Sequence, residues 1–237
     1  MRPRCILILL ALVSCQSPRQ PSAGDTSMRI GDAAMQAGMP DVALRVASRD
    51  VGKNPQNAAA LAQQGDAYRT LGRVTEAEAS YSRAIAIDSQ NMRGQTGLGL
   101  LLLKTDPARA EASFSRVVAQ TPGQGVALNG LGVARDLQGD HAKAQLAYRM
   151  ALATGSDSRS AQVNLGLSLA LSGDSAGAIA ILTPLAAEPR AERRVKDDLA
   201  VALVAAGRTE EARSILREEM SDDDSAKTVV AYRSLLQ

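Results

Sequence analysis

The chain of 237 residues has no tryptophan and one phenylalanine and is rich in alanine and leucine, a composition that favours close-packed helices over β-sheets. Its formal net charge of +2 includes Arg2 and Arg4 of the opening segment, and without these two the basic residues balance the acidic ones. Because nucleic-acid binding calls for a basic patch or stripe, we expect no nucleic-acid partner.

The opening segment has the layout of an export signal. Its two arginines supply a positive start, an unbroken apolar run covers residues 5–13, and small Ser14 precedes Cys15. The run is shorter than the roughly 20 residues of a membrane-spanning helix. A buried helix is disfavoured as well, because Pro18 follows closely. Residues 1–14 are therefore predicted to be a signal peptide.

The four residues LVSC (12–15) resemble the lipobox of bacterial lipoproteins. The resemblance implies that the signal peptide is cleaved just before Cys15 and that Cys15 is acylated. Several acyl chains together hold a protein stably at a membrane. Gln16 stands where an aspartate would indicate inner-membrane retention, which implies a lipid anchor on the periplasmic face of the outer membrane. Residues 15–23 would then be the lipidated cysteine and a flexible tether. With Cys5 removed in the signal, no thiol remains for a disulfide or a metal.

Small residues recur along the rest of the chain with a period of about 34 residues. The first two series are Gly31, Gly65, Gly99, Gly132, Gly166 and Ala200, and Ala43, Ala77, Ala110, Ala144, Ala178 and Ala212. The third is Gly38, Gly72, Gly139, Gly173 and Gly207. The third series is missing only in the shorter third unit, where the turn reads KTDP (104–107). This spacing predicts two helices per unit, joined at the third-series glycine.

The second unit illustrates the expected helix pair. One helix should end at Leu71, Gly72 should take the left-handed cap conformation, and the next helix should begin near Thr75. A glycine inside a helix costs about 1 kcal/mol relative to alanine. Its recurrence therefore predicts a close approach of the two helices, with Gly65 opposite Ala77.

The period and its residues resemble the tetratricopeptide repeat family. The second unit carries most of the signature at Leu61, Gly65, Tyr68, Ala77, Tyr81 and Ala84. The fourth unit matches at Leu128, Leu131, Gly132, Ala144, Tyr148 and Ala151. The resemblance implies an all-α fold, a right-handed α-solenoid of about six helix pairs over residues 24–226. A final helix is expected from about Ser225 to Leu236, with residues 227–237 capping the last repeat.

The sequence assembles no catalytic constellation. His141 is the sole histidine and is expected in a surface turn without catalytic partners, and an acylated Cys15 leaves no thiol for a nucleophile or a zinc cluster. GLGLLL (97–102) and GLGVAR (130–135) fall inside expected helices and do not complete the nucleotide-binding glycine pattern. We expect a chain that is not an enzyme, with no cofactor, metal or small-molecule substrate.

The first helices of such repeats line a concave groove, and the resemblance implies which positions face it. The ninth residue of each repeat is one of these groove-facing positions. It is Asp32 in the first repeat, Asp66 in the second and an apolar residue in each later repeat. We therefore expect a groove that is acidic near the tether and apolar toward its C-terminal half, where exposed apolar residues mark a protein-binding site. The expected partner-groove residues are Leu100, Asn129, Val133, Val163, Asn164, Leu167, Leu171 and Val201.

Two alternatives remain open for this groove. Its apolar strip is either free for a partner, or filled by the C-terminal helix and by contacts between repeats. Asn129 and Asn164 are the sharper candidates, because a carboxamide can both donate to and accept from a partner's backbone.

Three stretches extend the resemblance to the TadD family of lipoproteins of the tight-adherence (Flp) pilus machinery. They are QVNLGLSLALSGDSAGAIAIL (162–182), DDLAVALVAAGRTEEARSIL (197–216) and AYRSLL (231–236). This resemblance implies a scaffold that assembles the pilus or its outer-membrane secretin by binding a protein segment. A general periplasmic adaptor for cell-envelope enzymes would have the same sequence features and is the alternative.

Overall fold

The computed structural model describes residues 23–155 and 158–236, so the predicted signal peptide and Cys15 lie outside the described residues. Every regular element in this part is an α-helix. The first six are α1 (Ala23–Gln36), α2 (Pro40–Lys53), α3 (Ala58–Thr70), α4 (Val74–Ile87), α5 (Met92–Leu102) and α6 (Pro107–Gln120). The others are α7 (Gly125–Asp136), α8 (His141–Ala153), α9 (Ser158–Leu171), α10 (Ser175–Ala186), α11 (Arg193–Ala205), α12 (Thr209–Leu216) and α13 (Asp222–Leu235).

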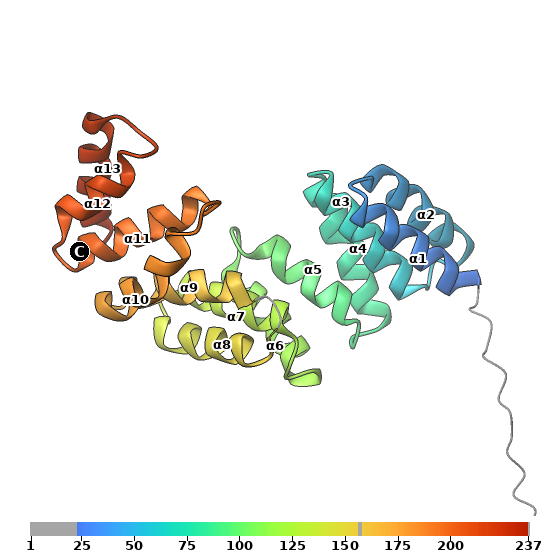
Figure 1. Cartoon of the computed structure of the whole chain (residues 1–237). Coiled ribbons are helices and arrows are strands. Elements are labelled where there is room, and N and C mark those ends of the chain that lie inside the picture. Colours follow the sequence, from blue (N-terminus) through green and yellow to red (C-terminus); the bar gives the residue numbers. More distant parts are fainter. Residues whose placement is uncertain (1–22, 156–157, 237) are drawn as a thin grey trace, which may run out of the picture.

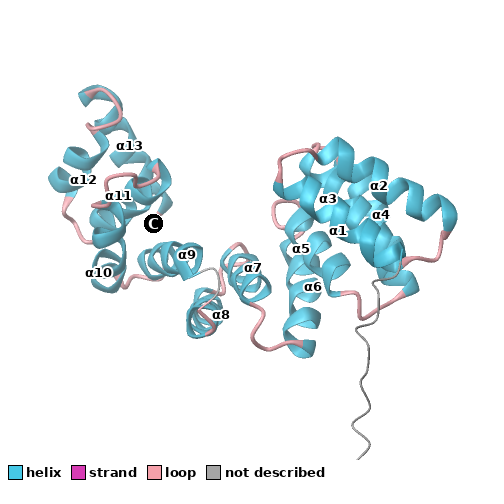
Figure 2. Ribbon diagram, turned by 45° about the vertical axis from the view of Figure 1, so that its right-hand side comes forward, coloured by secondary structure: helices cyan, strands magenta, loops and turns pink. Residues whose placement is uncertain are grey.

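Consecutive helices pack in pairs, and each pair stacks on the next along a curved array (Figure 1). Helices α1 to α12 form six pairs, and α13 packs against α11 and α12. Figure 2 shows α5, α7, α9 and α11 along the inner side of the curve. The predicted all-α solenoid of helix pairs is confirmed. None of the described helices is both long and apolar enough to cross a membrane.

The helix-interior glycines make room for large side chains of the facing helix. A Cβ atom at Gly65 would lie 2.6 Å from the ring of Tyr81, closer than real Cβ contacts come. Tyr81 and Ala77 are both completely buried. Close approach at Gly65 is therefore present as predicted, but the side chain that occupies the space is Tyr81 rather than Ala77. The reason is size, because the ring reaches across the interface and a methyl group does not.

Both glycines of each GLG sequence lie against an aromatic ring in the same way. Gly97 contacts the ring of Tyr81 in the preceding repeat, whereas Gly99 contacts Phe114 in its own repeat. Phe114 also lies against Gly130 of the following repeat. Each aromatic ring is thus held between two glycine-bearing helices, which links neighbouring repeats. The GLG sequences are packing elements inside α5 and α7.

The turns within the repeats follow the glycine pattern. Gly72 has φ of 72°, and the backbone N–H groups of Gly72 and Arg73 donate to the carbonyl oxygens of Arg69 and Tyr68. In the third repeat, which lacks this glycine, the Asp106 side chain instead accepts from the backbone N–H of Arg109 at 3.1 Å and starts α6.

The final helix begins earlier than the sequence predicts. Helix α13 starts at Asp222, three residues before the expected Ser225, and the predicted boundary at residue 227 falls inside it. The Oγ of Ser221 accepts from the backbone N–H of Asp224 and caps the helix. The three aspartates of the first turn also favour a helix start, because the positive end of the helix dipole lies there.

Candidate partner-binding groove

The inner face of the array contains a hollow of about 370 Å³ where repeats two, three and four meet. We call it the central hollow. Its lining residues are Asp66, Met92, Arg93, Thr96, Gly97, Leu100, Thr121 and Gln124. Helix α5 contributes most of them, α3 supplies Asp66, and the connection between α6 and α7 supplies the last two. The lining of the hollow combines apolar groups with hydrogen-bonding and charged groups.

Exposed apolar side chains lie in this hollow and at both ends of the next inner helix. Met92 and Leu100 belong to its lining and are exposed, Leu100 at 36%. Val126 and Leu137 are exposed at the two ends of the next inner helix, α7, the latter at 54%. The predicted groove residue Leu100 therefore faces solvent in the middle of the array. Exposed apolar groups in one region are typical of a protein-binding surface.

The C-terminal half of the groove differs from the prediction. Val163 and Val201 are 6% and 5% exposed and belong to the hydrophobic core. Val133 and Leu167 pack partly buried against the same core, and Leu171 is also half-buried. The inner helices α9 and α11, which carry the two valines, pack directly against each other. Helix α13 packs on α11, which carries Val201, and on α12, but on no other described helix, so it does not cover the part of the strip on α9.

A hydrogen-bonded row crosses the inner face of repeats four to six. The Nδ2 of Asn164 donates to the Oδ1 of Asn129 at 3.0 Å. The Nη2 of Arg194 donates to the Oδ1 of Asn164 at 2.6 Å. The structure thus brings the two predicted asparagines together, with Asn164 buried and Asn129 half-buried. Asn129 keeps its amide donors free of partners within the described part of the chain, so it is the better placed of the two to bind a ligand.

Asp198 lies next to this row and has an unusual environment. Its side chain is buried, and its Oδ2 makes no hydrogen bond within the described residues. The Nε of Arg194 is 3.7 Å from that oxygen, which is a Coulombic contact rather than a hydrogen bond. Burial raises the pKa of Asp198, the charge of Arg194 lowers it, and that of Asp197 raises it, and together they bring it to about 6.

The expected acidic end of the groove is bridged by an arginine whose pairing the sequence does not predict. Arg93 of the third repeat pairs with Asp66 through Nε and with Asp32 through Nη1, at 2.5 and 2.8 Å. Tyr81 also donates its hydroxyl hydrogen to Asp66 at 2.6 Å. Burial and the charge of Asp66 raise the pKa of Tyr81. Arg93 therefore offsets the two negative charges and ties three repeats together.

A second carboxylate, Asp136, joins repeats four and five. It accepts from the Oη of Tyr148 at 2.8 Å and from the Oγ of Ser168 at 2.7 Å. The Nδ1 of His141 lies 2.8 Å from its Oδ1. His141 thus has a carboxylate partner, in contrast to the unpartnered turn residue expected from sequence. Ser168 is completely buried and bonds to Asp136, so these groups form a structural link and do not present a nucleophile.

Comparison with solved structures shows the same fold at low sequence identity. MamA is 21% identical with a TM-score of 0.56, over 77% of this chain and 97% of that chain. The thermophilic TPR protein TTC0263 of Thermus thermophilus is 20% identical with a TM-score of 0.60, over 77% of this chain and 100% of that chain. PilW, described as a widely conserved type IV pilus biogenesis factor, is 17% identical with a TM-score of 0.64, over 92% and 94%.

Sequence comparison gives the family. No curated protein sequence matches the chain. The tetratricopeptide repeat model matches residues 28–91, 99–159 and 138–192, which together make up more than half of the chain. A curved stack of such repeats presents an extended concave surface for binding other proteins. The chain belongs to the tetratricopeptide repeat family.

Proposed function

We propose that this protein is a lipid-anchored scaffold that binds a segment of a partner protein across the central hollow. The observation that carries the proposal is the group of exposed apolar side chains around that hollow, among them Met92, Leu100 and Val126. No described helix covers them. An amphipathic helix or an extended segment with apolar anchors fits such a surface.

Polar groups that line the central hollow would orient the bound segment. Thr96, Thr121 and Gln124 line the same hollow. The Gln124 side chain already accepts from the backbone N–H of Ala127, which holds its carboxamide in place. Asn129 lies further along the groove with free amide donors. These groups suit the backbone of a partner segment, because each hydroxyl or carboxamide can donate or accept.

The anchor is the second part of the proposal. Cys15 would carry the lipid, and the chain would lie on the periplasmic face of the bacterial outer membrane. The support is the LVSC sequence after a basic start and an apolar run. Anchoring confines the groove near a membrane-bound partner and raises the effective concentration of that partner, so modest groove affinity suffices.

The third part is the system served, for which we propose assembly of a tight-adherence (Flp) pilus. The partner would be the secretin or another pilus-assembly component. Support comes from the resemblance of residues 162–182, 197–216 and 231–236 to TadD lipoproteins, and from the fold similarity to PilW. A general adaptor for cell-envelope enzymes remains the competing function.

One experiment tests groove and system separately. A strain lacking the gene is complemented with the wild-type chain, with Leu100→Asp, or with Leu146→Asp. Leu146 is a matched control, because it is an exposed leucine on the outer helix α8. We expect Leu100→Asp to lose crosslinking to the partner and pilus secretion, and Leu146→Asp to keep both.

The outcomes separate the two claims. Normal piliation in the strain without the gene contradicts the pilus role. Unchanged crosslinking by Leu100→Asp removes the groove from the proposal. Crosslinking to a cell-envelope enzyme, lost in Leu100→Asp with piliation intact, supports the general adaptor instead.

A further inference from the structure

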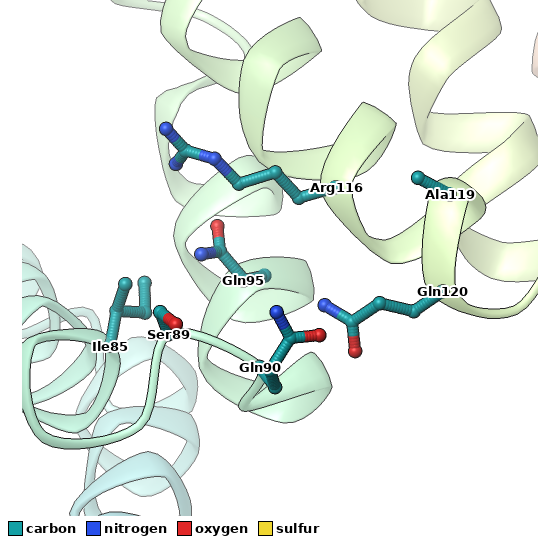
Figure 3. Close-up of a pocket in the computed structure, with 7 residues that line it drawn as sticks. All are labelled: Ile85, Ser89, Gln90, Gln95, Arg116, Ala119 and Gln120. Atoms are coloured by element: carbon teal, nitrogen blue, oxygen red, sulfur yellow. The ribbon is translucent and has the colours of Figure 1, made fainter.

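A second pocket lies away from the groove, between the outer helices α4 and α6 and the first turns of α5 (Figure 3). We call it the outer pocket. Its volume is about 500 Å³, within the range of about 300–1,000 Å³ typical of ligand sites. Its lining residues are Ile85, Ser89, Gln90, Gln95, Arg116, Ala119 and Gln120. The set contains one positive charge, three carboxamides and no acidic residue.

Gln95 is a buried polar residue whose side-chain oxygen has no partner among the described residues. It is 1% exposed, and its Oε1 is buried without a hydrogen-bond partner within the described residues. The same repeat position, relative to the packing glycine of the helix, holds Leu61 in repeat two and Leu128 in repeat four. Both leucines are completely buried. Repeat three thus places a carboxamide where its neighbours have an apolar side chain, and an unsatisfied buried acceptor is destabilising.

Figure 3 shows the Gln95 carboxamide between the side chain of Arg116 on α6 and Ser89 of the α4–α5 connection. The carboxamides of Gln90 and Gln120 point toward one another nearby. Arg116 is exposed and has neither an ion pair nor a hydrogen bond within the part of the chain that the structure describes. The pocket is therefore lined by an unpaired guanidinium and by a carboxamide whose oxygen is buried without a partner among the described residues.

We propose that the outer pocket binds a carboxylate-bearing peptide. Arg116 would pair with the carboxylate, since a guanidinium matches its two oxygens. The Gln95 carboxamide would turn to hydrogen-bond an adjacent peptide group, and Gln90 and Gln120 would bind the flanking backbone. The carboxylate belongs either to an acidic side chain or to a chain's C-terminus.

The segment of this chain that precedes α1 does not suit the pocket. Residues 15–22 contain no acidic residue and include Arg19, whose charge would repel Arg116. The chain's C-terminus follows α13, which among the described helices packs only on α11 and α12, away from α4 and α6, so a peptide of another protein is the proposed occupant. The site is separate from the central hollow, so this inference does not depend on the proposed groove function.

The test uses the full chain in detergent, labelled with ¹⁵N, and three capped peptides as probes. Acetyl-Ala-Glu-Ala-amide carries a side-chain carboxylate, acetyl-Ala-Ala-Ala with a free C-terminus carries a terminal one, and acetyl-Ala-Gln-Ala-amide carries neither. The Gln95 side-chain signal, assigned by its loss in Gln95→Leu, is followed by NMR. We expect one or both carboxylate peptides to shift it and to bind about 10-fold more tightly than the third. Which of the two binds identifies the source of the carboxylate.

Variants sharpen the test. Arg116→Ala should abolish the preference for carboxylate peptides. Arg83→Ala is the matched control. Exposed Arg83 occupies in repeat two the position that Arg116 occupies in repeat three, and repeat two has Leu61 at the position of Gln95. Gln95→Leu should weaken peptide binding about 3- to 10-fold while raising the melting temperature, since it removes the unpaired acceptor.

Two results would overturn the proposal. One is equal affinity for all three peptides, and the other is unchanged affinity in both Arg116→Ala and Gln95→Leu. Should Gln95→Leu fail to fold, exposed Arg116→Ala alone decides between binding and no binding.

Discussion

Gly132 lies so close to the ring of Tyr148 that a Cβ atom there would be 2.4 Å from its Cε1. The ring cannot easily retreat, because Tyr148 is buried and its hydroxyl donates to Asp136 at 2.8 Å. The spacing of α7 and α8 therefore depends on an aromatic ring packed against bare backbone.

The first prediction concerns this contact. Gly132→Ala should destabilise the protein by about 1–3 kcal/mol, since overpacking forces the ring or the helix to move. Gly52→Ala is the control, because Gly52 lies in α2 with no atom near its Cβ position. Helix propensity should make that variant more stable by up to about 1 kcal/mol. Urea denaturation compares the two, and equal effects would disprove the packing role of Gly132.

The second prediction is a pH dependence of stability caused by Asp198. Its pKa is about 6 in the folded chain, above the 3.8 of an ordinary aspartate side chain. Between about pH 4 and 6 the carboxyl group ionises in the unfolded state but stays largely protonated in the folded state, so the free energy of unfolding falls as pH rises. Above about pH 6 both states are ionised and this loss of stability stays constant. Asp198→Asn should therefore raise the free energy of unfolding by about 1–3 kcal/mol at pH 8 and have little such effect at pH 4. A pH-independent difference between the two proteins would contradict this.

The third prediction separates stability from binding in the asparagine row. Asn164→Ala should destabilise the chain by about 1–3 kcal/mol, because it removes a buried group bonded to both Asn129 and Arg194. Asn129→Ala should change the melting temperature less but weaken crosslinking to the partner. Thermal unfolding and crosslinking measured on both variants check this. A larger loss of stability in Asn129→Ala would reverse the assignment.

The fourth prediction tests the proposed anchor. Cys15→Ser should move the protein from the membrane fraction to the soluble periplasmic fraction, because no acyl chain can be attached through sulfur. Its circular dichroism should remain helical, since Cys15 lies before the first described helix. Continued fractionation with the outer membrane would contradict lipid anchoring through Cys15.

Most of the fold could be predicted because its signals are local. Gly72 has positive φ, and α3 and α4 end and begin within about one residue of the predicted positions, as expected for helix ends set by nearby residues. The start of helix α13 lies three residues before the predicted one, because the sequence pattern does not single out Ser221 as the capping residue of an acidic segment.

The groove was predicted less well. Leu100 is exposed as expected, but Val163 and Val201 are buried, although all three occupy inner-helix positions. The resemblance assigns each position a direction from its own helix. It does not include the distance to the neighbouring inner helix, which decides whether a side chain pointing inward meets solvent or another repeat.

The sequence by itself determined the repeat period, the helix pairing and the glycine turns, because these depend on backbone preferences and on small residues at regular spacing. Only the tertiary structure decided that Arg93 bridges Asp32 and Asp66, that α9 and α11 close the C-terminal half of the groove, and that Gln95 is buried without a partner among the described residues. These features depend on how closely helices from different repeats approach. That distance is set jointly by all the side chains between the helices, and no single repeat contains the information.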